Sequence, residues 1–332
     1  FTGTESLAAV SVCGPIMNVM IITLSGMSAG VLVVISSLLG AGENRQARDA
    51  AHTSLALYAI MAAVLTLVGL AFTPQLLLAV QTPLSAMPEA KRYLYTVFAG
   101  MSFSFGYNLI GALQQAQGNA TASMSFVLIS SIVNILLDAV LIVGLHMGAL
   151  GAALGTVLAQ FVAFCVGAVR FTHGNTVLQI SLGEVRFHKK HLKKILLFGV
   201  PTAANEVMVN LAMLTVSGVA NSFGLASSAA YGVGSRINSL AIFMDGAMNQ
   251  TLSAYASQNI GAKNKKRALT GLWKAIAISV SMALVSSLTV LVFAEDFAAC
   301  FDANPEVVRQ SAAFLRVTIW SYPLFAAVGP LI

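Results

Sequence analysis

The chain alternates between long apolar runs and short interruptions that contain charged residues, proline or glycine. Two of the runs, at positions 6–42 and 50–88, contain no Asp, Glu, Lys or Arg. Because about 20 apolar residues are enough for a helix to cross a bilayer, runs of this length predict membrane-spanning helices. The strands of a membrane barrel would instead alternate in polarity over about ten residues.

The interruptions divide the chain into nine predicted spans. They lie at about 6–39, 50–79, 93–116, 121–145, 149–170, 195–222, 226–259, 270–293 and 311–332. The predicted fold class is therefore an all-α integral membrane protein, a polytopic helical bundle with about nine to ten helices in this chain.

Composition agrees with this class, since 57% of the residues are hydrophobic, only 9% are charged and the mean hydropathy is +0.83. In a membrane protein the positions of the charges matter more than the net charge of +6, so we do not expect a nucleic-acid partner. The sequence has no nucleotide-binding loop, metal-ligand cluster or nucleophilic triad. We therefore expect neither an enzyme nor a cofactor.

The longest polar interruption, residues 170–194, contains six Lys or Arg residues and predicts a join between two lobes. We place an N-terminal lobe at 1–172, a basic loop at 173–194 and a C-terminal lobe at 195–332. Loops on the side of this basic loop contain 12 of the 18 Lys and Arg residues. The positive-inside rule then predicts that the central loop is cytoplasmic.

The two lobes also resemble each other in sequence. When position 3 is aligned with position 224, positions 3–47 and 224–268 share twelve ungapped identities. The repeat predicts two six-helix halves, or twelve helices in a full protein, so that this chain is a fragment lacking the first helix and the last two. Because each half has an even number of helices, the repeats should be parallel, related by an axis along the membrane normal.

One carboxylate interrupts the apolar pattern. Asp138 is the only Asp, Glu, Lys or Arg in the long segment from Tyr93 to Val169. Asn134 lies one helical turn before it on the same face, and Thr156 lies at the same predicted depth on the next helix. Their oxygens suit a small cation such as Na⁺, or a proton site. The alternative is that Asn134 and Asp138 only hydrogen-bond neighbouring helices.

The second lobe has its own charged residues within predicted spans. Glu206 should lie near the membrane midplane, and Arg236 and Asp245 are nine residues apart on one helix, on nearly opposite faces. All three are candidate cavity or substrate residues. For Arg236, a structural ion pair with another helix is the alternative.

Several short motifs occur in order along the chain: Ser36–Gly42, Gln117-Gly118-Asn119, Asn134–Asp138, the turn at 148–156, Ser235-Arg236-Ile237 and Ser257–Ala262. Taken together, these motifs resemble the MATE (multidrug and toxic compound extrusion) family over the whole chain. The resemblance implies a two-lobed plasma (inner) membrane transporter that exports amphipathic or cationic small molecules by alternating access, in exchange for Na⁺ or H⁺. We expect it to contact membrane lipid and to work as a monomer.

The resemblance also implies a cation site. Asn134, Asp138 and Thr156 match three residues of the family's N-lobe site, Asn108 is a plausible fourth, and an acid of the first helix lies outside this chain. Val209 stands where some branches have a Glu. The alternative function is a lipid-linked oligosaccharide flippase of the same superfamily, which would need more interior cations than Arg236 and Arg316. An intramembrane enzyme or a receptor would need catalytic clusters or an extramembrane domain.

Overall fold

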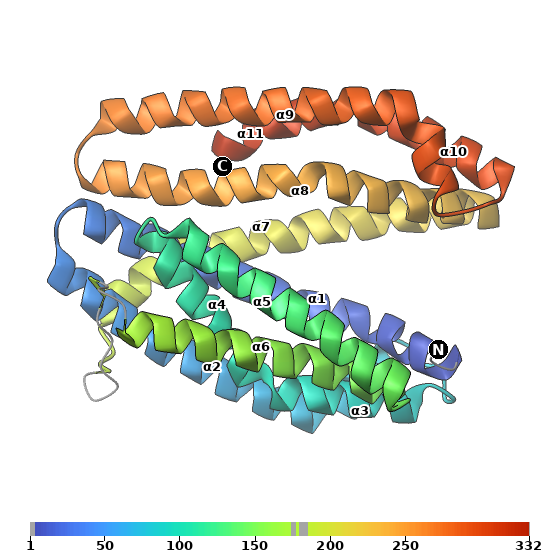
Figure 1. The fold of residues 1–332 in the computed structure, drawn as a ribbon, viewed down its shortest axis with the longest axis horizontal. Helices are drawn as coiled ribbons and strands as arrows, with labels where there is room; N and C mark the ends of the chain where they lie inside the picture. Colours follow the sequence, from blue (N-terminus) through green and yellow to red (C-terminus); the bar gives the residue numbers. More distant parts are fainter. Residues whose placement is uncertain (1–3, 174–176, 179–184, 332) are drawn as a thin grey trace. The chain divides into compact units, whose positions relative to one another are not determined.

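The structure is a computed structural model that describes residues 4–173, 177–178 and 185–331, and every regular element in these ranges is a helix (Figure 1). The prediction of an all-α fold is confirmed. The elements are α1 (Thr4–Gly40), α2 (Asn44–Ala79), α3 (Met87–Ala99), α4 (Met101–Ala116), α5 (Ala120–Asp138), the π-helix η1 (Ala139–Gly144), α6 (Gly148–His173), α7 (Lys189–Ser222), α8 (Leu225–Gly261), α9 (Lys265–Ala299), α10 (Pro305–Thr318), α11 (Ser321–Val328) and the short 3₁₀-helix η3 (Gly329–Leu331).

Each predicted span falls on one helix or on one helix pair. Among the described residues, six helices are long and apolar enough to cross a membrane, and two bent pairs raise this number to eight. Several helices begin before the predicted apolar span. The clearest case is α7, which begins at Lys189, inside the predicted loop 173–194. Polar residues can continue a helix beyond the hydrocarbon region, so the apolar pattern gave only the inner part of these helices.

Two spans expected as single helices are bent. The α3–α4 pair bends by 48° and the α10–α11 pair by 43°. Gly100 separates α3 from α4 and faces Val157 of α6, where a Cβ on residue 100 would lie 2.5 Å from Val157 Cγ2. Pro323 is the third residue of α11, where its missing N–H costs no helical hydrogen bond, so a new helix can begin there. Neither bend interrupts the apolar pattern of the sequence.

The internal repeat is visible in the helix boundaries. Under the alignment of position 3 with position 224, both ends of α1 coincide with those of α8, and the start of α2 coincides with that of α9. The turns between the paired helices also correspond. Gly42 (φ 75°) and Lys263 (φ 59°) both have left-handed backbone conformations. The next residue in each turn donates its N–H to the carbonyl five positions earlier, at 3.0 Å and 2.9 Å. The two turns therefore share one backbone geometry with different side chains.

The chain forms two compact units, Phe1–Ala204 and Asn205–Ile332, which we describe separately. The division falls inside α7, after the predicted start of the second lobe at residue 195. Small residues explain why the first half of α7 packs in unit 1. A Cβ on Gly30 of α1 would lie 2.9 Å from the backbone nitrogen of Gly199, so the two helices approach closely. The lobe boundaries drawn from the sequence stay a prediction.

The core of unit 1 lies among α1, α2, α4 and α6, with α4 packed against each of the other three. Tyr58 of α2 is 2% exposed, meets the edge of Phe105 of α4 at 5.7 Å and shares a 2.9 Å hydrogen bond with Ser28 of α1. The Tyr58 ring is thus buried among apolar groups while its hydroxyl keeps a hydrogen-bond partner. This contact fixes three helices to one another.

In unit 2, α8 and α9 pack against α10 and α11. Buried residues from all four helices form one core: Ala230, Val233, Ile237, Val290, Ala294, Ala298, Val307, Ala312, Leu315, Ile319 and Tyr322. Across its surface, Arg316 of α10 pairs with Glu295 of α9 at 3.0 Å. Because both partners are about half exposed, this ion pair should contribute little to stability in water.

The contact between α2 and α3 gives a first prediction. The ring of Phe98 lies against Gly69, which is buried, and a Cβ on residue 69 would overlap the ring. We expect Gly69→Ala to destabilise the protein by about 1–3 kcal/mol, as overpacked cores are destabilised. The measurement is the apparent Tm of the detergent-solubilised protein. Gly14→Ala is the control, because nothing lies within 4 Å of a Cβ there. Equal Tm values for the two variants would contradict the packing described for Gly69.

Candidate functional site

Asn134 and Asp138 lie on one edge of α5. The Nδ2 of Asn134 donates to the Oδ1 of Asp138 at 3.4 Å, and both side chains are half-buried. Ile135 and Leu136, between them in sequence, are 67% and 61% exposed. The helix therefore directs its apolar residues outward and its amide and carboxylate toward the interior of unit 1, as expected where charge is kept away from lipid.

The neighbour of this pair is Gly155 of α6. A Cβ on residue 155 would overlap the Oδ1 of Asp138 and would lie 3.3 Å from its Cγ and 3.5 Å from Asn134 Nδ2. Gly155 is buried, so the carboxylate occupies space that any other residue would fill. The sequence interpretation missed Gly155, since a glycine among many small residues of a membrane helix gives no chemical signal.

Asp138 is also the last α-helical residue of α5. The residues that follow form the π-helix η1, in which the N–H of Leu145 reaches the carbonyl of Val140 at 2.9 Å. Such segments inside helices are rare and are often found at functional sites. The wider turn brings the backbone of η1 close to α6, where a Cβ on Gly151 would lie 3.2 Å from the carbonyl oxygen of Leu141. The apolar pattern does not reveal this change of helix type.

The other predicted ligands hydrogen-bond to their own helices. Thr156 donates its hydroxyl to the carbonyl of Ala152 at 3.0 Å, and Asn108 donates its Nδ2 to the carbonyl of Ser104 at 2.8 Å. In each bond the side chain acts as the donor, so the lone pairs of its own oxygen stay available. A cation would bind through these oxygens. Thr156 directly follows Gly155, whereas no contact of Asn108 with Asp138 is found among the described residues. Their membership of a cation site stays a prediction.

Tyr93 is a further residue that sequence reasoning did not select. It lies on α3, is half-buried and interacts electrostatically with both Asp138 and the Cys13 thiol of α1. Its hydroxyl can donate to a carboxylate or offer an oxygen to a cation.

The described contacts do not bring Glu206, Arg236 and Asp245, the three candidate residues of unit 2, together at one site. Glu206 is half-buried, and its backbone carbonyl accepts from the Nδ2 of Asn210 at 2.9 Å. Arg236 is exposed on α8, and the side chain of Asp245 lies outside the described residues. The ion pairs found between described residues of unit 2 are Arg309–Glu306 and Arg316–Glu295. Roles for Glu206, Arg236 and Asp245 stay predictions.

Comparison with known proteins places this architecture in a family. The model of the MatE family matches residues 1–140 and 201–331. A probable multidrug resistance protein of Bacillus subtilis, YoeA, is 27% identical over 97% of this chain and 71% of its own length. The multidrug export protein MepA of Staphylococcus haemolyticus is 24% identical over 96% of this chain and 70% of its own length.

Solved structures show the same fold. The crystal structure of a mutant of VcmN, a MATE transporter of Vibrio cholerae, has a TM-score of 0.91 at 22% identity, covering 99% of this chain and 77% of that chain. The resemblance drawn from the sequence motifs is thus confirmed. The chain belongs to the MatE family and is a multi-span membrane transporter, not an enzyme.

Proposed function

We propose that this transporter exports amphipathic or cationic small molecules across the plasma membrane by antiport with Na⁺ or H⁺, and that Asp138 is the exchange centre. The names of the related proteins, multidrug resistance and multidrug export proteins, support the substrate class. The observation that carries the proposal is the Asp138 carboxylate itself, half-buried in a membrane helix beside an amide and a glycine that leaves it room.

The physical argument rests on the cost of charge. An ionised carboxylate inside a membrane protein is costly unless a cation or a proton neutralises it. The transporter therefore has a different free energy when a cation or proton neutralises Asp138 than when the carboxylate is ionised and unpaired. If the two access states bind the cation with different affinities, cation binding shifts their populations, which is what coupling requires.

The ligand set that we propose consists of hard oxygens. Asp138 supplies the charge, while the Asn134 carbonyl and the hydroxyl of Thr156 supply neutral oxygens from α5 and α6. Asn108 is the fourth member of the proposed set. Na⁺ accepts such oxygens, and a proton needs only the carboxylate, so both ions stay candidates.

Two further features belong to the proposal. The excess of Lys and Arg on one side supports a cytoplasmic central loop, and one chain is proposed to suffice for transport. The flippase alternative finds no support in the related proteins. It is weakened further because Arg316, one of its two interior cations, already pairs with Glu295.

The coupling ion can be tested with the full-length protein in proteoliposomes. We expect efflux of a cationic dye to follow either an imposed ΔpH or an imposed ΔpNa, and to stop when the matching ionophore collapses that gradient. Liposomes without protein, carrying the same gradients, give the background. Dye movement that is equally fast with and without both gradients would contradict antiport.

A further inference from the structure

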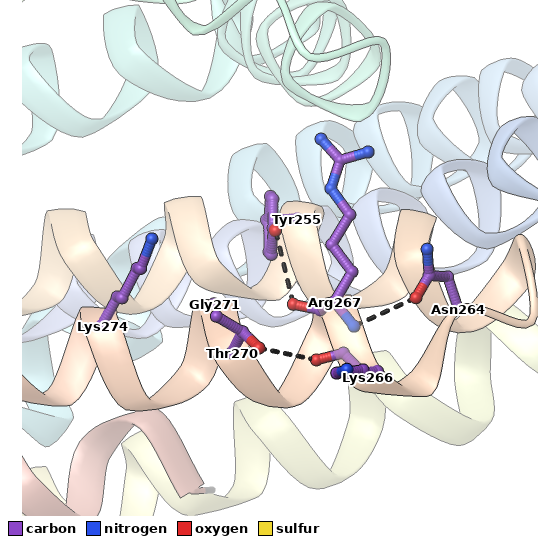
Figure 2. A pocket seen from close by; sticks show the side chains of 7 residues that line it. All are labelled: Tyr255, Asn264, Lys266, Arg267, Thr270, Gly271 and Lys274. Atoms are coloured by element: carbon purple, nitrogen blue, oxygen red, sulfur yellow. Dashed lines mark hydrogen bonds between the residues drawn. The ribbon is translucent and has the colours of Figure 1, made fainter.

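A cavity of about 390 Å³ lies at the turn between α8 and α9, far along the chain from Asp138. Three cationic side chains line it, those of Lys266, Arg267 and Lys274, together with Tyr255 of α8 (Figure 2). The transport proposal does not use any of these residues. The cavity is therefore a separate feature that needs its own explanation.

The aromatic wall of the cavity is held in place by α9. The Tyr255 ring packs on Gly271, where a Cβ would lie 2.8 Å from ring atom Cδ1, and its hydroxyl donates to the carbonyl of Arg267 at 3.4 Å. The guanidinium carbon of Arg267 lies 5.9 Å from the ring centre. Figure 2 shows Arg267 and Lys274 extending from α9 on either side of this ring.

Two of the cations share one side of α9. Arg267 and Lys274 are seven residues apart, which is two helical turns or about 10 Å along the axis. Thr270 lies between them and donates its hydroxyl to the carbonyl of Lys266 at 2.9 Å. Because the hydroxyl hydrogen is used in this way, the charged groups are the donors available to a ligand. Ammonium and guanidinium groups are strong donors to phosphate oxygens.

The positive charge of this end of unit 2 has no acidic counterpart nearby in sequence. From Gly246 to Ala294 the chain contains five Lys or Arg residues and no Asp or Glu. The ion pairs within the described part of unit 2 involve none of these five. Three cations around one cavity repel one another, and an anion would relieve that repulsion.

The internal repeat shows that the turn itself does not require this charge. The corresponding turn of unit 1 has the same backbone geometry but mixed charges: Glu43, Arg45 and Asp49 occupy the positions of Asn264, Lys266 and Thr270. Thr53 occupies the position of Lys274. The all-cationic face is therefore particular to the second repeat.

The cavity lies at the end of a predicted membrane span. The segment after Lys274, from 275 to 294, contains no charged side chain and is long enough to cross the hydrocarbon region. On the same side of α9 as Arg267 and Lys274, further into this segment, Ile278 and Val285 are 49% and 64% exposed. This side of α9 therefore combines an apolar surface for acyl chains with cations at headgroup level. Trp273, 67% exposed on another face, lies at the same level, and tryptophan is enriched at the boundary between lipid and water.

We propose that this cavity binds the phosphate headgroup of an anionic phospholipid, with Arg267 and Lys274 as the main contacts, Lys266 as a third, and the lipid tails along Ile278 and Val285. Basic pockets beside membrane helices commonly take such headgroups, and each cation near the surface adds to the attraction. The site is independent of the exchange at Asp138.

The test uses the purified full-length protein, titrated with phosphatidylglycerol or with phosphatidylcholine at constant ionic strength and followed by native mass spectrometry. We expect tighter binding of phosphatidylglycerol. The variant Arg267→Gln/Lys274→Gln should weaken it about 30-fold, on the scale of two charged contacts. Lys263→Gln/Lys265→Gln is the matched control, because it removes the same charge from the same turn outside the cavity, and should weaken it less than about twofold.

The exchange Arg267→Lys/Lys274→Arg keeps the charge and should retain binding, which separates loss of the site from loss of folding. Equal weakening by both Gln pairs would overturn the proposal, since it would indicate diffuse attraction to the basic turn. The proposal would also be wrong if inorganic phosphate, at the same concentration and ionic strength, displaced phosphatidylglycerol. That result would assign the cavity to a soluble anion.

Discussion

Asp138→Asn should strongly reduce gradient-driven efflux while leaving the protein folded in the membrane. The amide keeps the size of the side chain but cannot gain or lose the charge that we assign to exchange. Coupling free energies of about 1–3 kcal/mol correspond to effects of roughly 5- to 150-fold, and we expect a loss of efflux within this range. The measurement is the initial rate of dye efflux from energised vesicles, at matched expression.

Leu136→Asn is the matched control for this substitution. It places the same amide two positions away on α5, at a side chain that is 61% exposed on the outer face. We expect efflux within about twofold of the unmodified protein, because a residue on this face makes no contact with the exchange group. Similar losses for both variants would mean that polarity on α5, and not the charge of Asp138, limits transport.

Gly155→Ala should weaken cation binding without removing any ligand. The added methyl group would overlap Asp138 Oδ1 and stand 3.5 Å from Asn134 Nδ2, so the carboxylate must move for the chain to fold. Overpacking by one methyl group costs about 1–3 kcal/mol. If this free energy is lost from cation binding, the cation concentration that gives half-maximal efflux rises roughly 5- to 150-fold.

The control for Gly155 is Gly14→Ala in the same unit, where the new methyl group has open space. It should leave the cation dependence unchanged. At saturating cation, Gly155→Ala should reach the same maximal efflux rate as the unmodified protein. The substitution weakens cation binding, and a high cation concentration fills the site again. A variant whose half-maximal concentration is unchanged would contradict the closeness of α6 to the Asp138 carboxylate.

Much of the fold could be predicted from the sequence, because membrane helices are constrained by a simple pattern. Apolar length gave the spans, and the twelve identities between positions 3–47 and 224–268 gave a repeat that the bounds of α1 and α8 reproduce. The bends at Gly100 and before α11 could not be predicted in this way. They depend on packing against other helices, such as the contact of Gly100 with Val157, which leaves no trace in hydropathy.

The candidate site likewise contains residues that the sequence predicts and residues that it does not. Asp138 was found because a lone charge in apolar sequence is conspicuous, and Asn134 because helical periodicity places it one turn away. Gly155 and Tyr93 were missed because their contribution is spatial. Gly155 leaves a gap for the carboxylate, and Tyr93 lies on α3 close enough for the charge of the carboxylate to act on it. The π-helix after Asp138 has no sequence signature that we could have used.

The most direct test of the central claim is exchange in the absence of any imposed gradient. In proteoliposomes of the full-length protein, adding substrate to one side should release the coupling ion, measured as proton release with a pH dye or as movement of radioactive Na⁺. Our account predicts substrate-induced ion movement in the unmodified protein and none in Asp138→Asn, although that variant still binds substrate. Ion movement of equal size in Asp138→Asn would contradict the claim that Asp138 is the exchange centre.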